Sequence, residues 1–292
     1  MATQDQRAII TPEGFSLSQT CGPVVWSRGR WPDMDWLDGR LIWVGWEGER
    51  VVWRGVRQRG DTLLISGTAE AALDAVWASH VLGLEQVLPA FDDPVVRAVS
   101  ERFPGLRSFS HGSLYAGLVT AIVGQSISVA AAAVAQTRLS LLFNTAIQMN
   151  ARVFVPLPRA DQLATAEPSM VRACGVTNRR AAALVAIAGA ACQGGLPNRE
   201  TALSDADGSE RALRALPLVG PWTARSALLW GHGAVDAFPA GDVALLRAAR
   251  GAYGQPGLDL RGLDHLSDGW RPARGLASRL LWTNLLGTAP ES

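Results

Sequence analysis

The sequence predicts an α+β protein with a β-rich N-terminal domain, residues 1–85, followed by an all-helical domain, residues 86–292. Two observations support this prediction. In the first part, apolar and polar residues alternate with the period of two that is typical of strands, whereas from residue 92 onward apolar residues recur at i, i+3 and i+4, as in helices. The 292 residues, of which 48% are hydrophobic, are enough to form the cores of one or two domains.

The strands are expected in the segment "RLIWVGWEGERVVWRGVRQRGDTLLISG", residues 40–67, with "WEGER" as a hairpin turn. The following segment, "AEAALDAVWASHVLGL", predicts a helix that closes this unit. Seven of the eleven tryptophans lie in residues 1–85. We interpret them as the large apolar side chains that pack the strands against the helix. The alternative is a ligand-stacking surface on an independent binding domain.

Beyond residue 92, the apolar spacing predicts a series of helices joined by short connections that contain Pro or Gly. They fall within residues 92–103, 114–143, 159–166, 168–175, 178–195, 209–216, 221–233 and 271–287. The longest apolar stretch, residues 114–143, is interrupted by Gly124, Gln125, Ser126 and Ser128. We therefore expect two buried helices there and no membrane span.

The composition excludes several kinds of chemistry. The chain contains no lysine, so it has none for a Schiff base or for the phosphate site of a P-loop. With a net charge of only +1, binding to nucleic acid requires local clusters of arginine. The three cysteines and four histidines show no metal-ligand spacing, which argues against a metal site and fits a reducing cytoplasm. The first residues carry no export signal, so a cytoplasmic location is expected.

A helix-hairpin-helix is predicted at about residues 211–232 in "SERALRALPLVGPWTARSALLWGHG", where "PLVG" forms a tight turn between two helices. Gly220 and Pro221 stand where a helix start favours Gly and Pro. Free backbone N–H groups at such a start bind phosphate without a charged side chain. The hairpin is therefore a candidate DNA-binding element, with a plain connector as the alternative.

One carboxylate is placed to work with this hairpin. In "DAFPAGDVALLRAA", Asp242 precedes a helical pattern and fits the position of an N-terminal helix cap. It follows Trp222 by 20 residues, enough for one helix and a return loop that would bring it beside the hairpin. Asp242 is therefore a candidate for a chemical role as well as for a cap. Asp236, in the same segment, is interpreted as ordering its loop.

Several ordered blocks resemble the helix-hairpin-helix DNA glycosylase superfamily, and in particular its AlkA type, the 3-methyladenine DNA glycosylases II. The blocks are "LPLVGPWTA" with "FPAGD", "GLVTAIVGQSISVAAAA", "GVTNRRAAALVAIA" and "WRPARGLASRLLW". They span about residues 92–285, and the AlkA type also carries a β-rich N-terminal domain. The resemblance implies an enzyme that extrudes a damaged nucleotide from duplex DNA and cleaves its N-glycosidic bond.

The resemblance also assigns roles to particular residues. Asp242 matches the catalytic aspartate, which would stabilise the positive charge that develops on the sugar or orient the attacking water. Trp222 and Trp282 match aromatic positions of the base-binding pocket, and Tyr115 is a weaker pocket candidate, with core packing as the alternative for each. Trp222 also stands where bifunctional members carry the Schiff-base lysine. A monofunctional hydrolase without β-lyase activity is therefore expected.

The expected DNA contacts lie on the hairpin and on neighbouring segments: Gln125, Ser126, Leu218, Val219, Gly220, Thr223, Arg225 and Arg179. Ser126 stands at the position of the inserted wedge, which is apolar in the AlkA pattern, so Ile127 and a neighbouring loop are the alternatives. Leu218 stands where the hairpin motif usually has its first glycine. The family implies no metal or nucleotide cofactor, and a monovalent cation at the hairpin is left open.

The sequence thus predicts a monomeric glycosylase that removes alkylated purines, such as 3-methyladenine, from damaged double-stranded DNA in base-excision repair. No membrane association is expected. Two alternatives stay open: a glycosylase of the same superfamily that acts on oxidised or deaminated bases, and a non-catalytic protein that binds DNA damage. The residues do not rank the alkylated bases as substrates.

Overall fold

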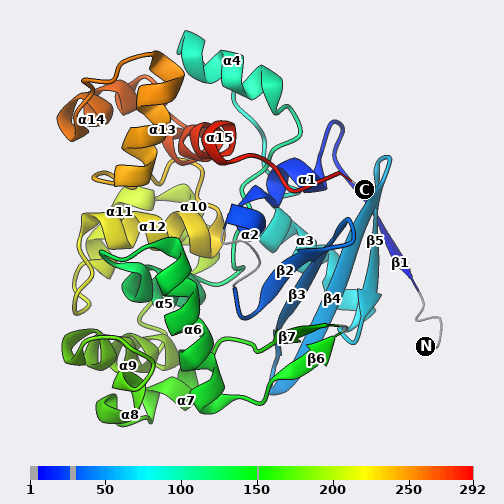
Figure 1. Cartoon of the computed structure of the whole chain (residues 1–292), viewed down its shortest axis with the longest axis vertical. Coiled ribbons are helices and arrows are strands. Elements are labelled where there is room, and N and C mark those ends of the chain that lie inside the picture. The colour runs from blue at the N-terminus through cyan, green and yellow to red at the C-terminus, as the bar shows by residue number, and fades with distance from the viewer. Residues whose placement is uncertain (1–5, 27–30, 150, 292) are drawn as a thin grey trace.

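The computed structural model describes residues 6–26, 31–149 and 151–291. Its N-terminal part forms a five-stranded antiparallel sheet in the order β1–β5–β4–β3–β2. The strands are β1 (Arg7–Ile10), β2 (Met34–Leu37), β3 (Arg40–Glu47), β4 (Arg50–Arg59) and β5 (Thr62–Gly67). The two-residue connection between β3 and β4 is the predicted hairpin turn. Figure 1 shows the sheet on one side of the molecule and most of the helices on the other.

One face of the sheet packs against helix α3 (Asp74–Leu82), the helix that the sequence predicts to close this unit. Val56 of the sheet and Trp77 of the helix belong to the same buried apolar cluster. Two short helices, α1 (Leu17–Thr20) and α2 (Gly22–Trp26), add their apolar side chains to it. The sheet, together with the helices that follow it, confirms the predicted α+β fold class.

The helices of the remaining chain pack around a second, larger apolar core. They are α4 (Pro94–Arg102), α5 (Leu114–Gly124), α6 (Val129–Phe143), α7 (Ala160–Ala164), α8 (Pro168–Arg172), α9 (Asn178–Cys192), α10 (Arg199–Ser204), α11 (Ala206–Leu213), α12 (Pro221–His232), α13 (Val243–Tyr253), α14 (Leu260–Asp268) and α15 (Arg274–Leu286). The apolar spacing does not predict α10 and α14, which have only six and nine residues.

The second part of the chain is not all helical, contrary to the sequence prediction. Strands β6 (Ile147–Met149) and β7 (Arg152–Phe154) form an antiparallel hairpin between α6 and α7. Buried Phe154 packs with Ile42 and Val44 of β3, so the hairpin attaches the helical part to the sheet, as Figure 1 shows. Three-residue strands are too short to show an alternating pattern in the sequence.

The apolar stretch of residues 114–143 folds as two helices, α5 and α6, as predicted. Ser126 lies in the break with a positive φ of 55°, and the Ser128 hydroxyl caps α6 by accepting a hydrogen bond from the Ala131 N–H. In the described part of the chain, none of the helices combines the length and the apolar character needed to cross a membrane.

Helices α5 and α12 touch backbone to backbone at two glycines. A Cβ atom on Gly117 would lie 2.6 Å from the Ala227 carbonyl oxygen and 2.8 Å from Gly231 Cα. A Cβ atom on Gly231 would in turn lie 2.9 Å from the Ser113 carbonyl oxygen and from Leu114 Cα. Only residues without a side chain fit at this crossing. The contact fixes the second helix of the hairpin against α5.

Candidate active site

The hairpin predicted at about residues 211–232 consists of α11, a turn and α12. Leu218 in the turn has a φ of 61°, the left-handed conformation that glycine adopts most easily. The backbone thus keeps the shape of a glycine turn although a leucine occupies the position. Gly220 begins α12 in an extended conformation with no side-chain cap on the helix start. The backbone N–H groups of this first turn are therefore suited to receive an anion.

Asp242 lies beside this hairpin at the start of α13, and its two carboxylate oxygens have different partners. Oδ1 accepts a hydrogen bond of 2.7 Å from the Leu245 N–H and caps the helix. Oδ2 accepts a hydrogen bond of 3.1 Å from the indole Nε1 of Trp222. The two hydrogen bonds fix the carboxylate in position. Asp242 and Trp222 are both partly exposed, so solvent can reach the carboxylate. The structure therefore brings together the two residues that the sequence separates by one helix and a loop.

The turn between α5 and α6 is tied to the same hairpin. Gln125 Nε2 donates to the Leu218 carbonyl oxygen at 2.9 Å and to Thr223 Oγ1 at 3.0 Å. Arg180, in the first turn of α9, donates to the Gln125 carbonyl oxygen. Three of the predicted DNA-contact residues thus belong to one hydrogen-bonded junction. The side chain of Val219, in the same turn, is buried. The DNA contact predicted for Val219 would therefore have to come from its backbone.

The predicted wedge position lies at the surface of this junction. Ser126 is exposed, and the next residue, Ile127, has 41% of its surface exposed. Val129 follows with 51% exposed. Ile127 and Val129 are therefore two apolar side chains that face solvent beside a polar junction. Such a surface is suited to insert into another molecule. The alternative wedge residue, Ile127, therefore has the exposure that the role requires.

Arg225 is not free to contact phosphate, contrary to the sequence prediction. It is buried, and its guanidinium is bound by two carboxylates of α11, with Nε 2.7 Å from Glu210 Oε2 and Nη2 bonded to Asp207. A buried arginine held by two acids joins α11 to α12 and carries little net charge to the surface. Arg179, in contrast, is exposed at the start of α9, so its predicted contact with DNA stays a prediction.

Trp282 is part of an aromatic stack, with only 5% of its surface exposed. Its ring stacks on Trp230 at a centroid distance of 5.7 Å, and Trp26 meets Trp230 edge-on at 6.4 Å. The buried guanidinium of Arg279 lies 4.1 Å from the Trp230 ring, a cation–π contact. Burial lowers the pKa of Arg279 to about 9. Apart from the tryptophan content, no pattern in the sequence predicts this stack, because its four residues come from three separate helices, α2, α12 and α15.

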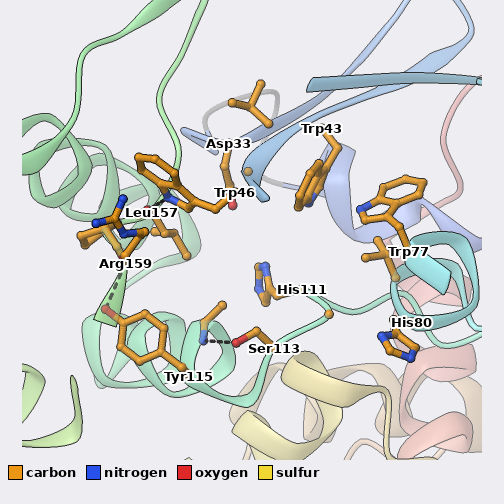
Figure 2. A pocket seen from close by; sticks show the side chains of 16 residues that line it. Asp33, Trp43, Trp46, Trp77, His80, His111, Ser113, Tyr115, Leu157 and Arg159 are labelled. Carbon is orange, nitrogen blue, oxygen red and sulfur yellow. Dashed lines mark hydrogen bonds between the residues drawn. The ribbon is translucent and has the colours of Figure 1, made fainter. Parts of the chain in front are cut away.

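Tyr115 does not lie with Asp242, which corrects its assignment to the same base-binding pocket. It is in the first turn of α5, ten residues or about 15 Å along the helix from Gln125. Its hydroxyl donates to the Pro158 carbonyl oxygen at 3.1 Å, and its ring lines a separate cavity of about 350 Å³ (Figure 2). The residues around that cavity were not predicted as a site, although the tryptophan-rich N-terminal segment suggested a ligand-stacking surface as an alternative.

The other aspartate of this region is already neutralised. Both oxygens of Asp236 accept hydrogen bonds from the Arg274 guanidinium, and Arg271 lies 3.3 Å away. Asp236 therefore orders its loop, as predicted. Asp242, in contrast, forms no ion pair with an arginine or histidine among the described residues, so its charge beside the hairpin is not neutralised.

No protein-family model matches the chain. Sequence similarity is nevertheless clear to DNA-3-methyladenine glycosylase 2 of Escherichia coli, with 30% identity over 61% of this chain and 60% of that protein. A 3-methyladenine DNA glycosylase from Archaeoglobus fulgidus has the same fold, with a TM-score of 0.71 and 21% identity over 95% of this chain and 98% of that one. The 8-oxoguanine glycosylase/lyase of Clostridium acetobutylicum, bound to double-stranded DNA, matches with a TM-score of 0.70 and 18% identity over 97% and 98%.

The chain thus spans about 60% of the length of the E. coli relative and nearly the whole length of the two solved structures. The helix-hairpin-helix, the aspartate beside it and the N-terminal sheet are the features that the resemblance predicts. The chain is thus similar in sequence to a DNA-3-methyladenine glycosylase over about 60% of its length, and it shares its fold with solved DNA glycosylases.

Proposed function

We propose that this protein is a DNA glycosylase that hydrolyses the N-glycosidic bond of alkylated purines, such as 3-methyladenine, in base-excision repair. The observation that carries the proposal is the Asp242 carboxylate, which is held by the Leu245 N–H and the Trp222 indole beside the hairpin. The name of the E. coli relative, a DNA-3-methyladenine glycosylase, supports alkylated purines as the substrate class.

The geometry suggests how the chain would carry out this reaction. The C1′–N bond breaks with its electron pair leaving on the base, and positive charge develops on the sugar. The negative charge of Asp242 stabilises that sugar cation, and water adds to C1′ and releases a proton. An alkylated purine is already positively charged, so it leaves as a neutral base and needs no strong general acid. The Trp222 ring supplies an aromatic face for such a cation.

Duplex DNA is the proposed partner. The N–H groups at the start of α12 would hold a phosphate, and Arg179 would add a surface charge nearby. Ile127 and Val129, exposed on the adjoining α5–α6 turn, would fill the space that the extruded nucleotide leaves. The solved complex of the related 8-oxoguanine glycosylase/lyase with double-stranded DNA supports this choice of partner.

The test is release of free base from duplex DNA treated with a methylating agent, measured by chromatography with untreated DNA as the control. We expect 3-methyladenine among the products. Release of oxidised or deaminated bases instead, from DNA that carries them, would identify a glycosylase for another lesion. Tight binding to damaged DNA without release of any base would identify a non-catalytic binding protein and overturn the proposal.

The proposed enzyme has no β-lyase activity. A lyase step needs an amine that forms a Schiff base with the abasic sugar, and the chain has no lysine. Borohydride reduction in the presence of abasic DNA is therefore expected to trap no covalent complex, with a lysine-dependent glycosylase/lyase as the positive control. A trapped band that depends on borohydride would contradict this prediction and point to the α-amino group as the nucleophile.

Trp222→Phe is expected to slow base release about tenfold, because it removes a hydrogen bond to a charged oxygen, worth about 1.5 kcal/mol, and keeps an aromatic ring. Single-turnover kinetics on methylated DNA would measure the change. The matched control is Trp36→Phe, which also removes an indole hydrogen bond, to the Pro290 carbonyl oxygen, but far along the chain from Asp242. Equal rates for the two variants would show that the indole N–H does not position the carboxylate.

A further inference from the structure

The side-chain amide of Gln125, directly after α5, joins two parts of the candidate site that are far apart in the sequence. Its Nε2 donates to the Leu218 carbonyl oxygen in the hairpin turn at 2.9 Å and to Thr223 Oγ1 in the first turn of α12 at 3.0 Å. An amide nitrogen carries two hydrogens, so both of its donors are used inside the protein. No donor of this amide is left for a nucleotide, which is the partner that the sequence predicts for Gln125.

The backbone of Gln125 is held as well. Arg180, in the first turn of α9, donates from Nη2 to the Gln125 carbonyl oxygen. The side chain and the backbone of one residue thus bind two different elements, the hairpin and α9. The four residues that follow, 126–129, are all exposed. Gln125 is therefore the anchored residue directly before the exposed segment that carries Ile127 and Val129.

The hydrogen bonds of Gln125 add a second contact between α5 and α12. The first is the glycine crossing, where Gly117 faces the backbone of Gly231. Gly117 and Gln125 are eight residues apart, and Thr223 and Gly231 are also eight residues apart, in the opposite chain direction. Eight residues correspond to about 12 Å of helix. Two contacts at this spacing fix both the close approach of the two helices and their relative shift.

Two residues beside the Gln125–Leu218 hydrogen bond have a backbone conformation that glycine adopts more easily. In the part of the chain that the structure describes, three residues other than glycine have a positive φ, namely Asp38, Ser126 and Leu218. Ser126 directly follows Gln125 and has a φ of 55°, and Leu218, whose carbonyl oxygen accepts the bond, has a φ of 61°. Such a conformation persists only where the surrounding structure enforces it. The Gln125 amide connects both turns, so it is placed to hold them in these conformations.

We propose that Gln125 is a positioning residue, which sets the distance between the exposed apolar side chains of the α5–α6 turn and the start of α12. The inference rests on the proposed function, because it assumes that the start of α12 holds a DNA phosphate while Ile127 enters the base stack. A side chain that enters the stack at one step must stay at a fixed distance from the phosphate that is held beside it. Without the two hydrogen bonds, Ser126 returns to the right-handed conformation that its side chain favours, and Ile127 loses its fixed place relative to the hairpin.

Extrusion of a base can be measured on the full chain without cleavage of the glycosidic bond. The probe is duplex DNA with 2-aminopurine in a mismatched pair, because the fluorescence of this base rises when it leaves the stack. Gln125→Met keeps the length of the side chain and removes both donors. At saturating protein, we expect this variant to show a fluorescence increase at least fivefold smaller than that of the wild type, with DNA affinity changed less than threefold. Base release from methylated DNA is expected to slow at least tenfold.

The matched control is Gln58→Met, in strand β4 of the N-terminal sheet. The Gln58 amide nitrogen also donates two hydrogen bonds, of 2.8 Å each, to the carbonyl oxygens of Phe15 and Gly60. Its amide oxygen accepts a third, of 2.6 Å, from the Leu17 N–H. The control therefore removes at least as many hydrogen bonds as Gln125→Met. It is expected to retain the fluorescence increase and the rate of base release of the wild type.

Ser126→Gly tests whether the hydrogen bonds act through the turn. Glycine adopts a positive φ at little cost, so the turn keeps its shape with less support. In a chain that already carries Ser126→Gly, Gln125→Met is therefore expected to slow base release only about threefold, against at least tenfold in the wild-type chain. If Gln125→Met fails to fold, Thr223→Val takes its place. It removes one of the two acceptors and keeps the shape of the side chain, and a threefold smaller fluorescence increase is expected.

Four results would overturn the inference. They are equal fluorescence for Gln125→Met and Gln58→Met, a loss of DNA affinity in Gln125→Met as large as its loss of fluorescence, equal slowing by Gln125→Met with and without Ser126→Gly, and no fluorescence increase with the wild-type protein. The second of these results would make Gln125 a direct DNA contact. A wild-type protein that raises the fluorescence but releases no base from methylated DNA would instead overturn the proposed enzyme activity and leave the positioning role of Gln125 in place.

Discussion

We expect Asp242→Asn to slow base release from methylated duplex DNA at least a hundredfold and to change DNA affinity by less than about threefold. The reason is electrostatic. A preorganised charge beside a developing cation contributes about 3 kcal/mol or more in a partly desolvated site, and each 1.4 kcal/mol is a factor of ten in rate. Single-turnover release gives the rate, and a binding titration with damaged DNA gives the affinity.

Asparagine is the right substitution because its side-chain oxygen can still accept from the Leu245 N–H and cap α13. The chain offers a matched control in Asp259, which caps α14 by accepting from the Gly262 N–H at 2.8 Å and lies on no hairpin. Asp259→Asn changes the charge of a helix cap in the same way and is expected to retain the wild-type rate. Equal rates for Asp242→Asn and the wild type would reduce Asp242 to a structural cap.

The second large effect concerns the crossing of α5 and α12. Gly117→Ala is expected to lower the free energy of unfolding by about 3 kcal/mol, because its methyl group would meet the backbone of α12 at 2.6 Å and force the helices apart. Denaturant unfolding followed by circular dichroism would measure the loss. The same contact holds the hairpin beside α5. Because the substitution would displace the hairpin, the variant is also expected to bind DNA more weakly than the wild type.

A glycine that contacts nothing serves as the control. Gly189 lies within α9, and a Cβ atom there would have no neighbour within 4 Å. Gly189→Ala is expected to raise the free energy of unfolding by about 0.5–1 kcal/mol, the usual gain from replacing glycine inside a helix. If Gly117→Ala behaved like Gly189→Ala, the close approach of α5 and α12 would not be a constraint on the fold.

Local features of the fold were predictable because they depend on residues close together in the chain. The period-two pattern of residues 40–67 and the two-residue turn predict β3 and β4, and the breaks after Gly124 separate α5 from α6. Asp242 was predicted as a cap from its place before an apolar run. The β6–β7 hairpin was missed, since its three-residue strands gain their stability from packing on β3 and not from a pattern of their own.

Contacts between distant segments were decided only by the tertiary structure. Nothing in the sequence shows that Arg225 pairs with Asp207 and Glu210, because a solvent-exposed and a buried arginine look the same in a helical pattern. The same holds for Tyr115, which points into a cavity at the far end of α5 from the hairpin.

By itself, the sequence determined the α+β class, the hairpin and the aspartate beside it, since each follows from spacing along one or two helices. The tertiary structure alone decided which charges are neutralised and where empty space is left. Trp222 and Asp242 were predicted to meet, and they do. The cavity beside Tyr115 was not predicted, because Asp33, Trp77 and His111 come from three segments that only the packed sheet and helices bring together.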